Sequence, residues 1–137
     1  MIKLKKNVKV VAAIIENEQE EILCCLRSLE MSIPNMWEFP GGKIEPNEHI
    51  FQTIQREIKE ESDTEIEPLE VFMEDTHEYE TFILHMTAVK AKIKSGLPKI
   101  SEHAQLIWLK RENLNSLVWA PADVPFVQKL MQEKKSE

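Results

Sequence analysis

Runs of apolar residues bounded by polar or turn-forming residues predict strands along most of the chain. The expected strands cover residues 8–16, 21–28, 69–79, 81–92 and 104–110. β-branched residues dominate the first run, which reads VKVVAAIIE, and a polar turn at 17–21 separates it from the second. The first two strands are therefore expected to form a hairpin.

Two further segments have the periodicity of helices. The first runs from about 48 to 62, and its apolar residues share one face: Ile50, Phe51, Ile54 and Ile58. Asn47 is expected to cap it. In the second, Asp123 is the expected cap and Pro125 the expected first-turn residue, ahead of a charged tail at 132–137. Strands mixed with one central and one terminal helix predict an α/β or α+β sandwich.

The composition is that of one folded domain. The 137 residues are 42% hydrophobic and carry charges of both signs, which predicts a single domain over 1–137. The formal net charge of −7 argues against binding of a nucleic acid polymer, because such binding needs clustered Lys and Arg. A ligand that carries phosphate would need metal ions. No membrane span or disulfide pattern is expected, and the predicted location is cytoplasmic.

Three glutamates lie beside the apolar face of the central helix. At about 100° per residue, Glu57, Glu60 and Glu61 fall on an arc that borders the apolar stripe, where unpaired carboxylates repel one another. One interpretation is a solvated acidic face, helped by Arg56 and Lys59. The other is a site for a hard divalent cation such as Mg²⁺, which prefers oxygen ligands. The preceding PGGK favours the second interpretation, because paired glycines bring the backbone close to a metal and to phosphate oxygens.

This segment carries most of the pattern G-x5-E-x7-R-E-U-x-E-E-x-G-U, in which U is a bulky apolar residue. The matching residues are Gly42, Glu48, Arg56, Glu57, Ile58, Glu60 and Glu61. The segment therefore resembles the Nudix box. The resemblance extends over most of the chain to the MutT-like branch of that family, which includes bacterial oxidised-dGTP and CTP pyrophosphohydrolases, through MWEFPGGKIE and PADVP. Asp63 replaces the family glycine that helps to end the helix, and Asp tolerates a left-handed conformation at some cost.

The resemblance implies a Nudix fold, with a mixed sheet between helices, and hydrolysis that depends on Mg²⁺ or Mn²⁺. The implied substrate is a (deoxy)nucleoside triphosphate, oxidised or modified, such as 8-oxo-dGTP or a cytidine type, which yields the monophosphate and pyrophosphate. Two alternatives stay open: a Nudix enzyme acting on another nucleoside diphosphate derivative, and a catalytically silent Nudix-fold binding module. A monomer or a homodimer is expected.

The resemblance also implies roles for individual residues. The expected metal ligands are the Gly41 carbonyl, Glu57, Glu60, Glu61 and Glu102, the last on the loop before the final strand. Arg56 is expected to brace the glutamates, and Glu48 to pair with it. The general base is Glu57 or Glu102, with Glu57 favoured. His103, beside Glu102, is a weaker candidate, because a lone histidine in such a loop is usually a polar surface residue.

Further residues are candidates for binding the substrate. Lys43 and Arg27 are available for phosphate oxygens. The candidates for the base pocket are Trp37, Phe39, Leu84, Trp119 and Asp123, of which Phe39, Trp119 and Asp123 carry the most weight. An ionised Asp123 only accepts hydrogen bonds, which favours a donor such as the amino group of cytosine, whereas a protonated Asp123 could meet oxidised guanine.

Overall fold

The strands of the protein form two sheets. The computed structural model describes residues 4–99 and 102–133. One sheet contains β1 (Lys6–Ile15), β4 (Gly41–Lys43), β5 (Glu65–Glu78) and β6 (Phe82–Ser95), and the other contains β2 (Glu21–Leu26), β3 (Trp37–Glu38) and β7 (Gln105–Lys110). The helices are α1 (Ile50–Ser62) and α2 (Val124–Gln132), with two short 3-10 helices, η1 (Arg111–Ser116) and η2 (Pro121–Asp123). Most of the charged tail expected at 132–137 lies outside the described residues.

The larger sheet is mixed, with the strand order β4-β1-β6-β5. β1 runs parallel to β6, and the pairs β1 with β4 and β5 with β6 are antiparallel. The smaller sheet has the order β3-β2-β7 and is antiparallel.

The expected hairpin between the first two strands is wrong. A strand has only two edges, and β1 uses both for β4 and β6, while β2 uses both for β3 and β7. One antiparallel bridge, between Glu16 and Ile22, is what remains of the predicted pairing.

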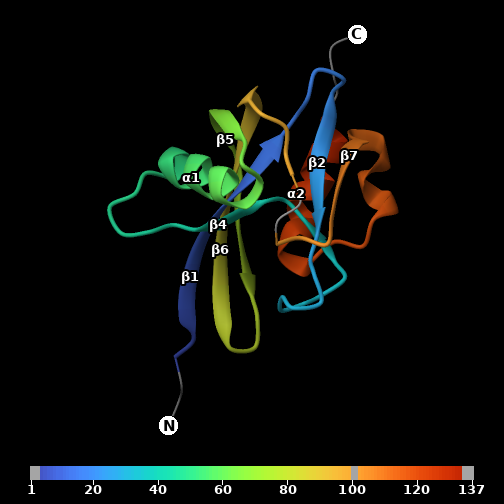
Figure 1. The fold of residues 1–137 in the computed structure, drawn as a ribbon. Helices are drawn as coiled ribbons and strands as arrows, with labels where there is room; N and C mark the ends of the chain where they lie inside the picture. The colour runs from blue at the N-terminus through green and yellow to red at the C-terminus, as the bar shows by residue number, and fades with distance from the viewer. Residues whose placement is uncertain (1–3, 100–101, 134–137) are drawn as a thin grey trace.

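The two helices cover opposite sides of β1, as Figure 1 shows. On the α1 side, alternate β1 residues pack with Ile54 and Ile58; on the α2 side, the intervening β1 residues pack with Phe126 and Leu130. Because both faces are covered, the end of β1 is apolar at every position and buried from 11 to 15. The predicted mixed sheet between helices is confirmed.

The N-cap of helix α1 lies two residues after Asn47, the residue expected to cap it. His49 is the N-cap: its Nδ1 accepts from the Phe51 amide at 3.1 Å, and the Gln52 side chain accepts from the His49 amide at 2.9 Å. Asn47 instead has a φ of 65° and belongs to the turn before the helix. At the other end Asp63 is left-handed, with a φ of 52°, and takes the place expected for the family glycine.

Helix α2 also starts without the cap that the sequence predicted. Asp123 precedes the helix, but its side chain makes no capping hydrogen bond. Pro125 does lie in the first turn. In the described part of the chain, neither helix is long and apolar enough to cross a membrane.

The left-handed Asp63 gives a test of the helix end. Asp63→Gly and Asp63→Ala both remove the exposed ion pair with Lys59, whose atoms are 2.7 Å apart, but only alanine keeps a Cβ in the unfavourable conformation. Urea denaturation should therefore show Asp63→Gly to be more stable than Asp63→Ala by about 1 kcal/mol. Equal stability of the two variants would show that the helix end tolerates a Cβ without strain.

Candidate active site

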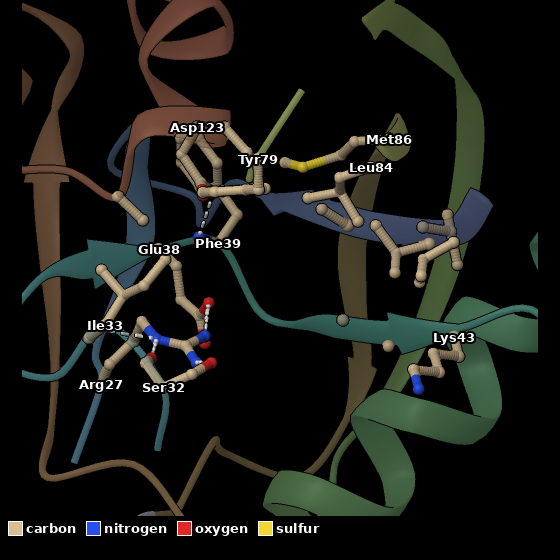
Figure 2. A pocket seen from close by; sticks show the side chains of 18 of the residues that line it. Arg27, Ser32, Ile33, Glu38, Phe39, Lys43, Tyr79, Leu84, Met86 and Asp123 are labelled. Carbon is tan, nitrogen blue, oxygen red and sulfur yellow. Dashed lines mark hydrogen bonds and ion pairs between the residues drawn. The ribbon is translucent and has the colours of Figure 1, made fainter. Parts of the chain in front are cut away.

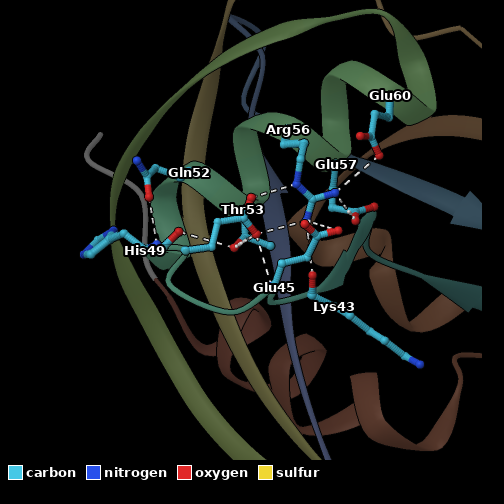
Figure 3. A network of polar contacts seen from close by, with 9 residues as sticks. Lys43, Glu45, His49, Gln52, Thr53, Arg56, Glu57 and Glu60 are labelled. Carbon is cyan, nitrogen blue, oxygen red and sulfur yellow. Dashed lines mark hydrogen bonds and ion pairs between the residues drawn. The ribbon is translucent and has the colours of Figure 1, made fainter.

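The guanidinium of Arg56 lies among carboxylates of the second half of α1 and of the loop before the helix, as Figure 3 shows. Its Nε and Nη2 donate to the two carboxylate oxygens of Glu48 at 2.7 and 3.0 Å. Its Nη1 donates to Glu57 at 2.8 Å and to Glu60 at 3.3 Å. The hydrogen bonds from Arg56 lower the pKa of Glu48 to about 2. The expected pairing of Glu48 with Arg56 is present, and the same arginine contacts two of the three helix glutamates.

The paired glycines of β4 are needed for space and not for a tight turn. Neither has a positive φ. A Cβ on Gly41 would overlap the carbonyl oxygen of Val11 in the neighbouring strand, and a Cβ on Gly42 would overlap the carboxylate of Glu57. Only glycine lets β4 lie this close to β1 on one side and to a glutamate of α1 on the other.

Glu61 is the most deeply buried acid of the group. Its Oε2 is buried and has no hydrogen-bond partner among the described residues. Burial, together with the charges of Glu57 and Glu38, raises the pKa of Glu61 to about 9. A buried oxygen without a partner is costly unless a proton or a cation satisfies it.

Glu102 lies on the exposed loop before β7. Its negative charge is one cause of the raised pKa of Glu61, so the loop brings a further carboxylate toward the helix. Within the described ranges 4–99 and 102–133, however, no three His, Cys, Asp or Glu side chains are already arranged as a metal-binding group. Arg56 holds Glu57 and Glu60, whose carboxylates would have to turn to converge on a cation. The hard oxygen donors of these acids and the unpartnered Oε2 of Glu61 fit a small divalent ion.

A cavity of about 310 Å³, whose lining residues Figure 2 shows, adjoins the acidic group at Gly42, which also contacts Glu57. Its apolar walls include Val10, Ala12, Phe39, Phe82, Leu84 and Met86. Arg27, Ser32, Glu38 and Asp123 supply polar groups at one end. All three residues of β4 line it as well, so one strand forms a wall of the cavity and also contacts Glu57.

The arrangement of box residues, paired glycines and cavity agrees with the comparison to known families. The NUDIX domain family matches residues 6–130. The chain belongs to the Nudix family.

Relatives of this Nudix hydrolase include characterised bacterial enzymes. The CTP pyrophosphohydrolase of Escherichia coli K12 is 34% identical over 126 residues, which are 92% of this chain and 93% of that protein. The 8-oxo-dGTP diphosphatase of the same organism is 32% identical over 127 residues, 91% of this chain and 97% of that protein. The solution structure of a MutT protein from methicillin-resistant Staphylococcus aureus 252 has a TM-score of 0.77 and 42% identity, and the match covers 96% of this chain and 100% of that one.

Asp123 of the Nudix domain points into the cavity and does not cap α2. Its Oδ1 accepts a hydrogen bond from the Phe39 amide at 3.1 Å, which draws the side chain away from the helix start. Burial raises the pKa of Asp123 to about 8, and the charge of Glu38 acts in the same direction. The predicted capping hydrogen bond is therefore absent, and Asp123 lines the cavity instead.

The aromatic candidates divide between cavity and core. Phe39 lines the cavity, as Leu84 does. Trp119 does not: it lies behind Phe39, with ring centroids 4.7 Å apart, and its indole Nε1 donates to the Leu114 carbonyl at 2.8 Å. Trp37 is bridged to Trp119 and is also absent from the cavity wall. Because Trp119 lies outside the described cavity wall, its contact with a base stays a prediction.

The two predicted phosphate ligands differ in their surroundings. Lys43 is exposed at the cavity edge, and Figure 3 shows its side chain directed away from Arg56. Arg27 is mostly buried, and its donors are directed at Glu38, at the side chain of Ser32 and at two backbone carbonyls. Lys43 is thus the better placed of the two for a phosphate.

Sequence reasoning missed two residues of the cavity wall, Glu38 and Tyr79, and gave His103 little weight. Glu38 accepts hydrogen bonds from Arg27 and His103, and Tyr79 lines the cavity while stacking on Phe82 with centroids 4.8 Å apart. His103, expected on the surface, is buried. The sequence did offer a signal for Glu38, which lies between Trp37 and Phe39. Alternate residues of a strand face opposite sides, so an acid between two aromatic residues faces away from both. The contacts of Tyr79 and His103 join distant segments and leave no local pattern.

The raised pKa of Asp123 predicts how stability changes with pH. Folded Asp123 keeps its proton to about pH 8, whereas the unfolded group ionises near its ordinary pKa of 3.8. Between these values the folded state binds more protons, so the contribution of this group to stability falls as pH rises. Asn has no proton to lose. The stability of Asp123→Asn relative to wild type should therefore increase from pH 4 to pH 8, by at most about 1.4 kcal/mol per pH unit.

The measurement is urea denaturation across that pH range, with Asp63→Asn as a control. The ion pair with Lys59 lowers the pKa of Asp63 below its ordinary value of 3.8, so this group is ionised in both states above pH 4, and the stability difference between Asp63→Asn and wild type should stay constant across the range. A constant difference between Asp123→Asn and wild type would mean that Asp123 is ionised in the folded protein.

Proposed function

We propose that this Nudix hydrolase is a pyrophosphohydrolase that cleaves (deoxy)nucleoside triphosphates to the monophosphate and pyrophosphate. The observation that carries the proposal is the double role of β4, which lines the cavity and also contacts Glu57 of the acidic group. A nucleotide with its base in the cavity would lay its phosphates along β4 toward the glutamates. The CTP pyrophosphohydrolase and 8-oxo-dGTP diphosphatase activities of the two E. coli relatives support this substrate class.

Nudix hydrolases use divalent metal ions, and we propose Mg²⁺ or Mn²⁺ for this one. The proposed ligands are the Gly41 carbonyl, Glu57, Glu60, Glu61 and Glu102. The unpartnered Oε2 of Glu61 and the purely oxygen donor set support this choice. When bound, the cation supplies positive charge that stabilises the phosphates and the leaving pyrophosphate.

The residues of the chain itself orient the reacting groups. Arg56 is held by the two hydrogen bonds that it donates to Glu48, and it also donates to Glu57 and Glu60, so it fixes the direction of their carboxylates. Glu57 is the proposed general base, with Glu102 as the alternative. The Glu57 carboxylate lies against the Gly42 backbone, beside the path proposed for the phosphates. Lys43, exposed at the cavity edge, is the proposed phosphate contact.

Asp123 is the proposed residue for recognition of the base. With a pKa of about 8, its carboxyl group is mainly protonated at neutral pH and offers both a donor and an acceptor. Its Oδ1 already accepts a hydrogen bond from the Phe39 amide, so Oδ2 is the oxygen proposed to face the base. A neutral carboxyl suits a base edge with a donor beside an acceptor. Oxidised guanine and cytosine both have such an edge, and we propose 8-oxo-dGTP or a cytidine triphosphate as the preferred substrate.

A product screen with Mg²⁺ tests the proposal. The panel contains 8-oxo-dGTP, dGTP, CTP, dCTP and ATP, together with a nucleotide sugar and a dinucleoside polyphosphate, ranked by kcat/KM. The expected result is release of pyrophosphate and a monophosphate, fastest for 8-oxo-dGTP or for a cytidine triphosphate. Faster cleavage of the nucleotide sugar or the dinucleotide would replace the proposed substrate class. Absence of any product with Mg²⁺ or Mn²⁺ would indicate a binding module.

The proposed general base predicts a large loss of turnover on substitution. Glu57→Gln removes the charge and the proton acceptor while keeping the shape, so kcat should fall by a factor of about 10²–10⁴ at saturating Mg²⁺. The melting temperature should stay within a few degrees of wild type or rise, because one like charge is removed. The matched control is Glu45→Gln, an exposed acid whose oxygen lies 3.9 Å from Arg56. Its kcat should be close to wild type, and a Glu57→Gln enzyme as active as this control would refute the assignment.

A further inference from the structure

We propose that Glu38 is a positioning residue that holds one wall of the cavity and the loop of Glu102 in a single arrangement. Each oxygen of its carboxylate has a different partner. Oε1 accepts from Nη1 of Arg27 at 2.5 Å, and Oε2 accepts from Nε2 of His103 at 2.8 Å. The side chains of Glu38 and Arg27 are each 19% exposed and that of His103 is 8% exposed, so solvent screens these contacts little.

On one side, Glu38 fixes the arginine that shapes the loop at 28–36. The Nε of Arg27 donates to the carbonyl of Ser32 at 2.7 Å and to that of Ile33 at 3.2 Å, and its Nη2 donates to Ser32 Oγ at 3.2 Å. Ser32 and Ile33 line the cavity, as Figure 2 shows. The shape of this wall therefore depends on where the guanidinium of Arg27 is held.

Local backbone preference opposes the shape of this loop. Ile33 has a φ of 53°, which is a genuine outlier for a β-branched residue. It also precedes Pro34, a position that favours extended backbone. Because the chain does not prefer this conformation on its own, it depends on the hydrogen bonds from the Arg27 side chain together with the backbone hydrogen bonds of the loop.

On the other side, Glu38 fixes the loop before β7. His103 follows Glu102 directly, and the next amide, that of Ala104, donates to the Leu26 carbonyl at 2.9 Å. The bond between the buried imidazole and Glu38 thus holds the backbone from which Glu102 extends. Glu102 in turn acts on Glu61, whose pKa it helps to raise. This step rests on the proposed function for the role of Glu102 in holding metal.

One carboxylate therefore couples the cavity to the acidic group. Removal of the His103 imidazole should disturb the loop at 28–36, because Glu38 links His103 to Arg27. A residue with a merely local structural role would affect only its own neighbours.

Amide hydrogen exchange measured by NMR, without metal or nucleotide, tests the coupling. The probes are three hydrogen-bonded amides: Met31 and Asn35 in the first loop, and Ala104 in the second. Glu38→Ala should accelerate exchange at all three by about tenfold, the loss expected for a hydrogen bond to a charged group, while amides of β1 and α1 keep their wild-type rates. Glu38→Gln keeps the side-chain length and should give a smaller acceleration at the same amides.

A double-mutant cycle shows whether the effect passes through Glu38. His103→Ala should accelerate exchange at Met31 and Asn35 in the wild-type background and have no further effect there in the Glu38→Ala background. The matched control, Glu30→Ala, removes an exposed carboxylate from the same loop and should leave Ala104 unchanged. The proposal is overturned if exchange rises uniformly through the core, if Ala104 is insensitive to Glu38→Ala, or if His103→Ala has the same effect in both backgrounds.

Mn²⁺ binding, followed by electron paramagnetic resonance of the free ion, separates this proposal from the proposed function. Glu38→Ala and His103→Ala should both weaken Mn²⁺ binding, and Glu30→Ala should not. If the wild-type protein binds Mn²⁺ and neither Glu38→Ala nor His103→Ala weakens that binding, the link from Glu38 to Glu102 is overturned. Failure of the wild-type protein to bind Mn²⁺ would refute the proposed metal site, and the exchange measurements would still decide the coupling between the loops.

Discussion

Repulsion among the carboxylates of α1 is the constraint on which the site depends. Glu57, Glu60 and Glu61 lie within about one helical turn, next to the core, where like charges are costly. The guanidinium of Arg56 offsets this repulsion by donating hydrogen bonds to Glu57 and Glu60. Both carboxylate oxygens of Glu48 accept from the same guanidinium and hold it in place. A free arginine would have many rotamers, so the bidentate pair gives the acidic group a defined geometry before any cation is present.

Close packing of β4 carries this geometry to the cavity. Gly42 leaves room for the Glu57 carboxylate, and Gly41 lies against the Val11 carbonyl of β1. Ile54 and Ile58 anchor α1 on the same strand by packing into the core on its side. The acidic group and the cavity are therefore both positioned by β1, the most deeply buried strand of the larger sheet. A shift of α1 along this sheet would change the distance from the acids to the cavity.

Periodicity predicted the parts of the fold that local pattern controls. The apolar face of α1 and the acids on its border follow from residue spacing, and the family pattern identified Arg56 and Glu48 as partners. Strand pairing could not be predicted, because a run such as 8–16 does not show which strands occupy its edges. The sequence also could not predict that Asp123 lines the cavity while Trp119 lies in the core. Both side chains are buried, and they differ in their hydrogen bonds: Asp123 accepts from the Phe39 amide and Trp119 donates to the Leu114 carbonyl. The bridge through Glu38 joins three distant segments, so no spacing rule reveals it.

The two halves of the site differ in what holds them in place. The acids of α1 project from a helix whose backbone hydrogen bonds and buried apolar face fix their positions. The polar end of the cavity depends on loops, one with a strained Ile33 and the other carrying Glu102, and side-chain hydrogen bonds hold both. Stability to local opening is lower where side-chain bonds replace a packed backbone. Substitutions in the loops should therefore alter the shape of the cavity at little cost to the fold, whereas substitutions on the buried face of α1 should disturb the acidic group and the core together.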